Sequence, residues 1–139
     1  MTYRSSNVRS GSRFEREFAK LLSDNGFWVH LLARNIAGQQ PADIIAMYHG
    51  GAYLIDCKVC ENDRFPFSRV EENQRWAMKK WLEAGGTSPQ FALKGSTGSI
   101  WMLNYEWVLI REEAGDKSVS CAKDRDFLIP FEEWLVNVT

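Results

Sequence analysis

The sequence predicts a single α/β domain built on a central mixed sheet flanked by helices. The chain has 139 residues, of which 45% are apolar and 25% are charged, a balance typical of one globular domain. Two segments with the helical spacing of apolar residues are separated by short apolar runs rich in β-branched and aromatic residues. Helices that alternate with strands in this way favour a mixed sheet with helices packed against it.

Composition also limits where the protein works. No apolar run approaches the length of a membrane span, and the first residues lack the apolar stretch of a secretory signal. The three cysteines are an odd number, which suits a reducing compartment better than a disulfide framework. We therefore expect a cytoplasmic protein with no membrane partner.

The N-terminal region is expected to be a flexible basic arm, residues 1–10, followed by one domain over residues 11–139. Ser12 is predicted to begin a helix, because its side chain can cap the first turn while Glu15 reaches back in a Ser-x-x-Glu box. Asn25-Gly26 is predicted to end it. The apolar face of this helix comprises Phe14, Phe18, Leu21 and Leu22.

Three strands are expected next. Residues 27–33 form a short apolar run, and residues 35–41 read as a loop because they contain Gly, Gln and Pro. Residues 44–48 and 52–59 are two further strands, and the connection over residues 49–51, His-Gly-Gly, predicts a hairpin.

A second helix is predicted to open at Ser68, with a capping box to Glu71, and to stop at Gly85-Gly86. The remaining expected elements are strands over 91–93 and 100–103, a short helix over 104–111, and a strand followed by a helix within 119–138.

The residues that indicate chemistry lie on the predicted hairpin. Asp56 and Lys58 are two apart on one strand, so their side chains project from the same face about 6–7 Å apart, while Cys57 points into the core. Asp43 precedes the neighbouring strand. Two carboxylates and one lysine therefore converge at one end of the sheet.

Two close carboxylates repel each other unless a cation lies between them. Oxygen ligands of this kind suit Mg²⁺ or Mn²⁺. Such a metal polarises a phosphoryl oxygen and acidifies a water, and a nearby lysine orients that water or offsets charge in the transition state. The pattern therefore favours phosphodiester hydrolysis.

The motif Pro41-Ala42-Asp43 … Asp56-Cys57-Lys58 resembles the PD-(D/E)XK nuclease signature, with one Ala inserted between Pro and Asp. Residues 11–18 and 26–29 are similar to the first helix and strand of archaeal-type Holliday junction resolvases, and residues 65–74 resemble a segment of RecU-type resolvases. The resemblance covers residues 11–94 and implies a restriction-endonuclease-like core.

The resemblance also implies roles for individual residues. Lys58 would position the attacking water, and Gln74 would support the site from the second helix. The implied metal ligands are Asp43, Asp56, the backbone carbonyl of Cys57, and Glu15 either directly or through water.

The function that the resemblance implies is that of a Mg²⁺-dependent endonuclease, with Mn²⁺ as a substitute and no small-molecule cofactor. The expected substrate is branched DNA, above all the four-way junction of recombination and repair, and the expected assembly is a homodimer with paired sites. A bacterial or phage-infected host cell is the expected setting. Two alternatives stay open: a nuclease of the same superfamily acting on flaps, ends or single strands, and an inactive DNA-binding module with this fold.

Charge is unevenly distributed along the chain. Net charge is −1, yet residues 1–34 carry six bases against three acids, whereas residues 105–139 carry four bases against eight acids. A basic N-terminal region can track phosphates despite the overall balance. The predicted DNA contacts are Arg4, Arg9, Arg13, Arg16, Arg34, Arg69 and Arg75.

Each of these residues also has a purely structural interpretation. Glu15 is the third residue of its predicted capping box, and Asp43 has the position of a turn residue before a strand. Asp56 and Lys58 could form an ion pair across the sheet. Arg69 and Arg75 could belong to a solvated helix face.

Overall fold

The computed structural model describes residues 3–32 and 40–139, with side chains from residue 11 onwards. Its helices are α1 (Tyr3–Asp24), α2 (Glu72–Glu83), α3 (Tyr105–Glu113) and α4 (Phe131–Val138), with a 3-10 helix η1 (Phe67–Arg69). Its strands are β1 (Trp28–Leu31), β2 (Ile44–Tyr48), β3 (Gly51–Val59), β4 (Arg64–Pro66), β5 (Gln90–Lys94), β6 (Ile100–Asn104), β7 (Ser118–Ser120) and β8 (Leu128–Pro130).

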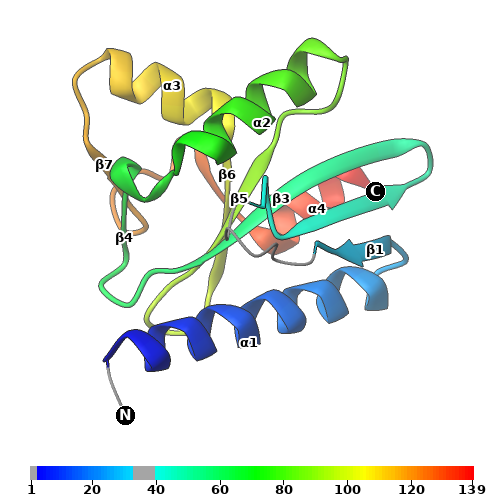
Figure 1. Ribbon diagram of the computed structural model, residues 1–139, viewed down its shortest axis with the longest axis horizontal. Helices are drawn as coiled ribbons and strands as arrows, with labels where there is room; N and C mark the ends of the chain where they lie inside the picture. The colour runs from blue at the N-terminus through cyan, green and yellow to red at the C-terminus, as the bar shows by residue number, and fades with distance from the viewer. Residues whose placement is uncertain (1–2, 33–39) are drawn as a thin grey trace.

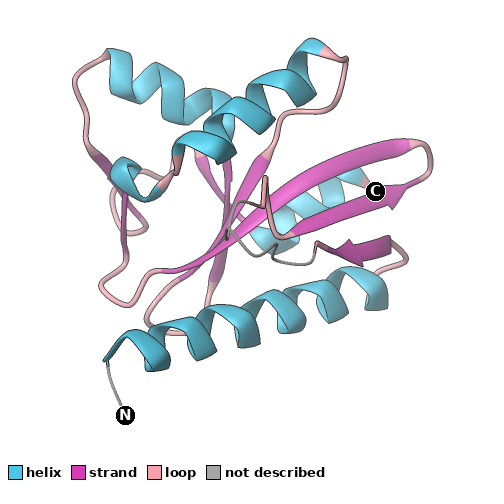
Figure 2. Cartoon of the chain, in the orientation of Figure 1, coloured by secondary structure: helices cyan, strands magenta, loops and turns pink. Residues whose placement is uncertain are grey.

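The main sheet has the strand order β1-β2-β3-β5-β6-β8 and lies between two layers of helices (Figure 1). Strands β3 and β5 are parallel and α2 connects them, whereas the other neighbouring strands pair antiparallel. The predicted α/β class with a central mixed sheet is therefore confirmed (Figure 2).

Each face of the sheet buries its own hydrophobic cluster. Phe14 and Phe18 of α1 pack with α4 against Ile55 of β3 on one face. Met78 of α2 and Val108 of α3 belong to the cluster on the other face. This two-sided burial explains why the central strands read as nearly continuous apolar runs. A charged residue in such a strand therefore lies inside the protein.

The hairpin predicted at residues 49–51 is confirmed. Tyr48 pairs with Gly51, so His49 and Gly50 form a two-residue turn. Both turn residues have positive φ, 45° and 85°, the conformation that suits a tight antiparallel hairpin. The turn sets the register of β2 against β3, and that register decides which side chains meet further along the hairpin.

Helix α1 starts earlier than the sequence predicts. It begins at Tyr3 rather than Ser12, so the backbone of residues 3–10, assigned above to a flexible arm, is helical. Glu15 therefore lies in the middle of a continuous helix, and the interpretation of this residue as part of a capping box is wrong. The predicted end at Asn25-Gly26 is correct, with Gly26 at φ 90°.

The start of α2 also differs from the prediction. Ser68 lies in η1, and Glu71 is the N-cap of α2, which begins at Glu72. The capping box joins Glu71 to Gln74 instead of joining Ser68 to Glu71. This shift places Gln74 in the first turn of α2, directly over the sheet.

Strand β4 was not predicted from the sequence. It pairs antiparallel with β7 in a separate two-stranded sheet, with Phe65 opposite Val119. Both residues are buried, so this small sheet extends the core on the α2 side. Among the described residues, no helix is long and apolar enough to cross a membrane.

Candidate active site

The site forms where β2 begins and β3 continues past it. Ile44 of β2 pairs with Ile55, whereas β3 runs on to Val59. The backbone N–H of Asp43 donates to the carbonyl of Ile55 at 3.2 Å. Asp43 therefore lies across from Asp56, and the two predicted acids are brought together at one end of the hairpin.

The Asp43 carboxylate completes the backbone pairing of β3. The backbone N–H of Cys57 donates to Asp43 Oδ2 at 2.7 Å, and the Gln40 side-chain amide donates to Oδ1 at 2.5 Å. Asp43 is buried, with 4% of its surface exposed. The interpretation of Asp43 as a turn residue therefore does not account for its contacts.

The Asp56 carboxylate is buried more deeply and has different partners. The side-chain amide of Gln74, from α2, donates to Asp56 Oδ1 at 2.9 Å. Lys58 Nζ lies 3.1 Å from Asp56 Oδ2, so the ion pair considered above is present. Asp56 Oδ2 accepts no hydrogen bond of good geometry within the described chain.

The electrostatics of the pair are unbalanced. Burial raises the pKa of Asp43 to about 7, and the neighbouring Asp56 charge adds to the rise. Burial also raises the pKa of Asp56, although the Lys58 ammonium opposes that change. One lysine thus faces two carboxylates. Without a further cation, the pair tends to retain a proton near neutral pH.

Glu15 reaches the same region from α1. Its negative charge contributes to the raised pKa of Asp56, after burial and against the effect of Lys58. However, no three His, Cys, Asp or Glu side chains of the described residues lie close enough together to hold a metal ion. The structure therefore brings Asp43 and Asp56 together and leaves Glu15 as a nearby charge.

The residues present fit a divalent cation. Two adjacent buried carboxylates supply oxygen ligands, and Asp56 Oδ2, which faces Lys58 Nζ, accepts no hydrogen bond of good geometry in the described residues. The residues that would hold the cation are Asp43 and Asp56. A hard ion that keeps several waters suits such a small set of protein ligands.

Cys57 separates the two polar side chains of β3. Its side chain is buried in the cluster that contains Phe14 and Phe18, on the sheet face that packs against α1. Burial raises the pKa of this thiol well above its usual value, so it stays protonated. Cys57 therefore contributes its backbone to the site, as the predicted alternation along the strand requires.

Sequence reasoning missed two residues of the site, Gln40 and Asn73. Gln40 lies in the segment before β2 and is buried next to Asp43. The side-chain amide of Asn73, from α2, donates to the backbone carbonyl of Gln40 at 2.9 Å. Only the proximity of Gln40 to Asp43 and of Asn73 to Gln74 along the chain could have drawn attention to them.

The predicted DNA contacts fall into separate groups. Arg13 and Arg16 are exposed on α1. Arg4 and Arg9 lie in the N-terminal part of α1, where only the backbone is described, and Arg34 lies outside the described residues. Arg69 donates to the carbonyl of Val59 at 2.9 Å, which ties η1 to the end of β3.

Arg75 is engaged by other residues of the chain. Its guanidinium donates to both carboxylate oxygens of Glu112, at 2.8 and 2.9 Å, and to the carbonyls of Phe67 and Val70. These contacts join α2 to α3 and to η1. The ion pair explains Arg75 better than the predicted contact with a DNA phosphate.

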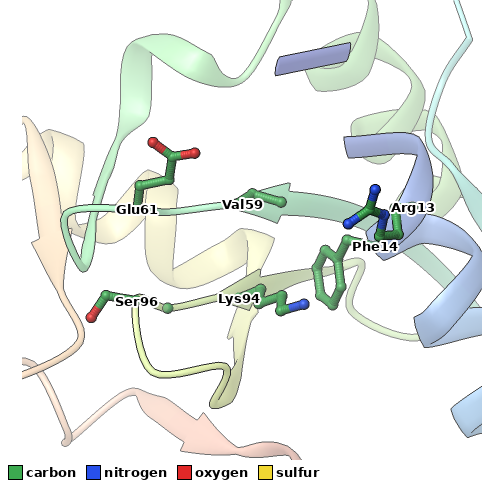
Figure 3. Close-up of a pocket in the computed structure, with 7 residues that line it drawn as sticks. Arg13, Phe14, Val59, Glu61, Lys94 and Ser96 are labelled. Carbon is green, nitrogen blue, oxygen red and sulfur yellow. The ribbon is translucent and has the colours of Figure 1, made fainter. Parts of the chain in front are cut away.

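A pocket of about 270 Å³ lies between α1 and the ends of β3 and β5 (Figure 3). Arg13 and Lys94 line it together with Glu61. Lys94 is paired with Glu17 at 3.1 Å, so the charges around the pocket largely cancel. Arg13 is more exposed than Lys94 and lies near Val59, the last residue of β3.

Comparisons with known proteins agree with this fold. The sequence matches the family model of the archaeal Holliday junction resolvase (Hjc) over residues 6–134. No curated protein sequence matches the chain. Among solved structures, the chain is similar to Hjc, a Holliday junction resolvase from the archaeal hyperthermophile Archaeoglobus fulgidus. The superposition has a TM-score of 0.68 at 17% identity and covers 90% of this chain and 99% of the other. The expected restriction-endonuclease-like fold is thereby confirmed.

Proposed function

This chain belongs to the archaeal Holliday junction resolvase family, and on that premise we propose that Asp43 and Asp56 hold the divalent cation with which it cuts branched DNA. Membership of the family makes the protein a junction-resolving nuclease. The metal, the catalytic residues and the assembly are the parts that we propose.

The observation that carries the metal site is the unbalanced pair of buried acids. Asp43 and Asp56 are 4% and 1% exposed, and Lys58 is paired with Asp56. An isolated buried charge is costly unless it is paired. A fold that keeps two buried acids beside one lysine is therefore suited to bind a cation.

We propose Mg²⁺ as the cation and Mn²⁺ as a substitute. The bound metal would polarise a phosphoryl oxygen and acidify a water. Lys58, with Nζ held beside Asp56, would orient the attacking water or offset charge that develops on the phosphate. Gln74 holds Asp56 in place. The backbone carbonyl of Cys57 would be a further ligand of the metal, and Glu15 would approach the metal directly or through a water.

DNA would approach over α1. Arg13 and Arg16 are exposed on this helix, and Glu15 lies between them in the sequence. Exposed arginines can contact phosphates without sequence preference. The proposed DNA contacts also include Arg4, Arg9, Arg34 and Arg69, of which Arg69 donates to the carbonyl at the end of β3.

A four-way junction has to be cut in two strands, and we propose that a homodimer supplies the two sites. Light scattering coupled to gel filtration at micromolar concentration tests this part. A monomer under these conditions, with no dimer on the junction, would contradict paired cutting but would not affect the proposed hydrolytic site.

The proposed location is the cytoplasm of a bacterial or phage-infected host cell, where recombining DNA is present.

The central experiment compares DNA shapes of matched sequence. A labelled four-way junction, duplex, flap and single strand are each incubated with the protein and with Mg²⁺ or EDTA. We expect paired symmetric nicks in the junction with Mg²⁺ only. Metal-dependent cutting of the flap or single strand instead of the junction would favour a general nuclease. Binding without cutting of any DNA would favour the inactive module.

Calcium provides a further control. Ca²⁺ prefers a looser coordination shell, and it should support junction binding without turnover. Rapid cutting with Ca²⁺ would contradict the proposed role of the small hard cation.

A further inference from the structure

Gln40 makes a polar contact that neither the signature motif nor the strand pattern accounts for. Its side-chain Nε2 donates to Asp43 Oδ1 at 2.5 Å, and 9% of the residue is exposed. Asp43 Oδ2 accepts the backbone N–H of Cys57. Both oxygens of this carboxylate are therefore held, one by the sheet backbone and one by Gln40.

Gln40 is itself fixed from α2. The side chain of Asn73 donates to the Gln40 carbonyl at 2.9 Å, across 33 residues of chain. The next residue of α2, Gln74, donates to Asp56 Oδ1. Two consecutive residues in the first turn of α2 thus reach the two acids of the site: Gln74 directly, and Asn73 through Gln40.

The two acids have matching supports. A glutamine amide donates to Oδ1 of each, Gln40 to Asp43 and Gln74 to Asp56. A carboxylate that accepts such bonds keeps its rotamer, and hydrogen bonds to a metal-ligating carboxylate orient it toward the metal. Of these two supports, only Gln74 was expected from the sequence.

We propose that Gln40 is a positioning residue for the metal site: its amide orients Asp43, and Asn73 holds Gln40 in place. This inference rests on the proposed metal-dependent function. Gln40 Oε1 is a buried oxygen without a hydrogen bond among the described residues. Because it belongs to the same amide, it lies beside Asp43 and offers an acceptor to a water of a hydrated cation.

The test measures metal binding directly. The substitution Gln40→Met keeps the length of the side chain and removes the donor. Affinity for Mn²⁺ is measured by titration calorimetry, and affinity for Mg²⁺ by the concentration that raises the melting temperature of the DNA-free protein. We expect Gln40→Met to weaken both about 10–100-fold, as is usual when a support of a metal ligand is lost.

Gln90 provides a matched control. It is a glutamine of similar burial, 6% exposed, and its amide donates to the side chain of Asn104 and the carbonyl of Ser88 and not to either acid. Gln90→Met removes the same kind of donor from the interior. It should lower the melting temperature without changing the affinity for Mn²⁺, which separates positioning from general stability.

Asn73→Ala gives a second variant in case Gln40→Met does not fold. It should weaken Mn²⁺ binding by a smaller factor, and it should have little further effect when combined with Gln40→Met because both act on Asp43. Unchanged affinity for Mn²⁺ in Asn73→Ala and in folded Gln40→Met would overturn the inference.

The outcome is independent of nuclease activity. If the wild-type protein cuts no DNA but Gln40→Met still weakens Mn²⁺ binding, the positioning role holds and the proposed function fails. If the wild type cuts junctions and Gln40→Met binds Mn²⁺ and cuts at the same Mg²⁺ concentrations, the proposed function holds and the positioning role fails.

Discussion

Two groups of charged side chains in this protein differ in their net charge. Arg75 and Glu112 form a pair of opposite charges, joined by two parallel hydrogen bonds between α2 and α3. Asp43, Asp56 and Lys58 are more deeply buried and carry one negative charge in excess when both carboxyl groups are ionised. The balanced pair is complete within the chain. The unbalanced group keeps a proton near neutral pH or, as we propose, binds a further cation, and this difference separates a structural ion pair from a proposed binding site.

The largest expected effect is the loss of cleavage in Asp56→Asn. This substitution removes the excess negative charge while keeping the shape of the side chain. We expect junction cleavage in Mg²⁺ to fall about a thousand-fold or more, because a catalytic metal supplies several kcal/mol of transition-state stabilisation. Junction binding in Ca²⁺ should be retained, because the lost charge repels phosphates.

Asp24→Asn is the control for this substitution. Asp24 is an exposed acid paired with Lys20 on α1, so its loss should leave cleavage unchanged. An Asp56→Asn variant that keeps most of its activity would show that the unbalanced group is not the metal site.

The second prediction concerns pH in the absence of metal. Between 3.8, the ordinary pKa of an aspartate, and about 7, the raised pKa of Asp43, the folded protein holds a proton that the unfolded chain releases. The unfolding free energy should therefore fall as pH rises through this window, with a slope of up to about 1.4 kcal/mol per pH unit for each proton released.

Urea unfolding in EDTA at several pH values measures this slope. Asp43→Asn should reduce it, and Mg²⁺ should stabilise the wild type more at pH 8 than at pH 5, because metal and proton compete for the same oxygens. The same pH dependence in the wild type and in Asp43→Asn would show that Asp43 is not the group that titrates.

For the balanced pair, Arg75 and Glu112, we expect a substitution to lower stability and to leave cleavage unchanged. Arg75→Met removes hydrogen bonds to Glu112 and to two backbone carbonyls, which should destabilise the fold by about 2 kcal/mol. Cleavage per folded molecule should stay at the wild-type level at a temperature where the variant is folded. If Arg75→Met lost junction affinity with unchanged stability, Arg75 would be a DNA contact after all.

The smallest expected effect belongs to an exposed cation outside both groups. Arg13→Ala should weaken junction binding in Ca²⁺ a few-fold and reduce the slope of log affinity against log salt by about one, as expected for one lost phosphate contact. Lys123→Ala, in the acidic C-terminal region, is the matched surface control. Equal salt slopes for the wild type and Arg13→Ala would place the DNA elsewhere.

The positions of Asp43 and Asp56 could be predicted because local sequence rules determine them. The His49-Gly50 turn sets the hairpin register, and the period of two along β3 places Asp56 and Lys58 on one face. Residues near each other in sequence determine both features. The same reasoning predicted that Cys57 would face the core, and the structure buries it there.

The helix starts were harder to predict because competing signals overlap. Ser12 and Glu15 have the spacing of a capping box, whereas residues 3–10 are polar and offer no apolar face that would reveal a helix. At α2, a Ser68 box and a Glu71 box overlap, and the second is used because Phe67 is buried in η1. At α2, tertiary packing decides between the two local patterns.

The contacts that complete the site depend on residues far apart in sequence. Gln40 reads as a polar loop residue until Asn73, 33 positions later, is placed beside it. Likewise, nothing near Arg75 in the sequence indicates Glu112, 37 positions later. No propensity or spacing rule covers such distances, so these contacts required the structure.

The hydrogen bond from Cys57 to Asp43 gives the protein an internal reporter. On β3, this amide donates to a carboxylate rather than to a backbone carbonyl, so its hydrogen bond depends on whether that carboxylate carries a proton or a metal. Its amide chemical shift and its rate of exchange with deuterated water should therefore follow metal occupancy. Nuclear magnetic resonance could thus follow the site in the absence of any DNA.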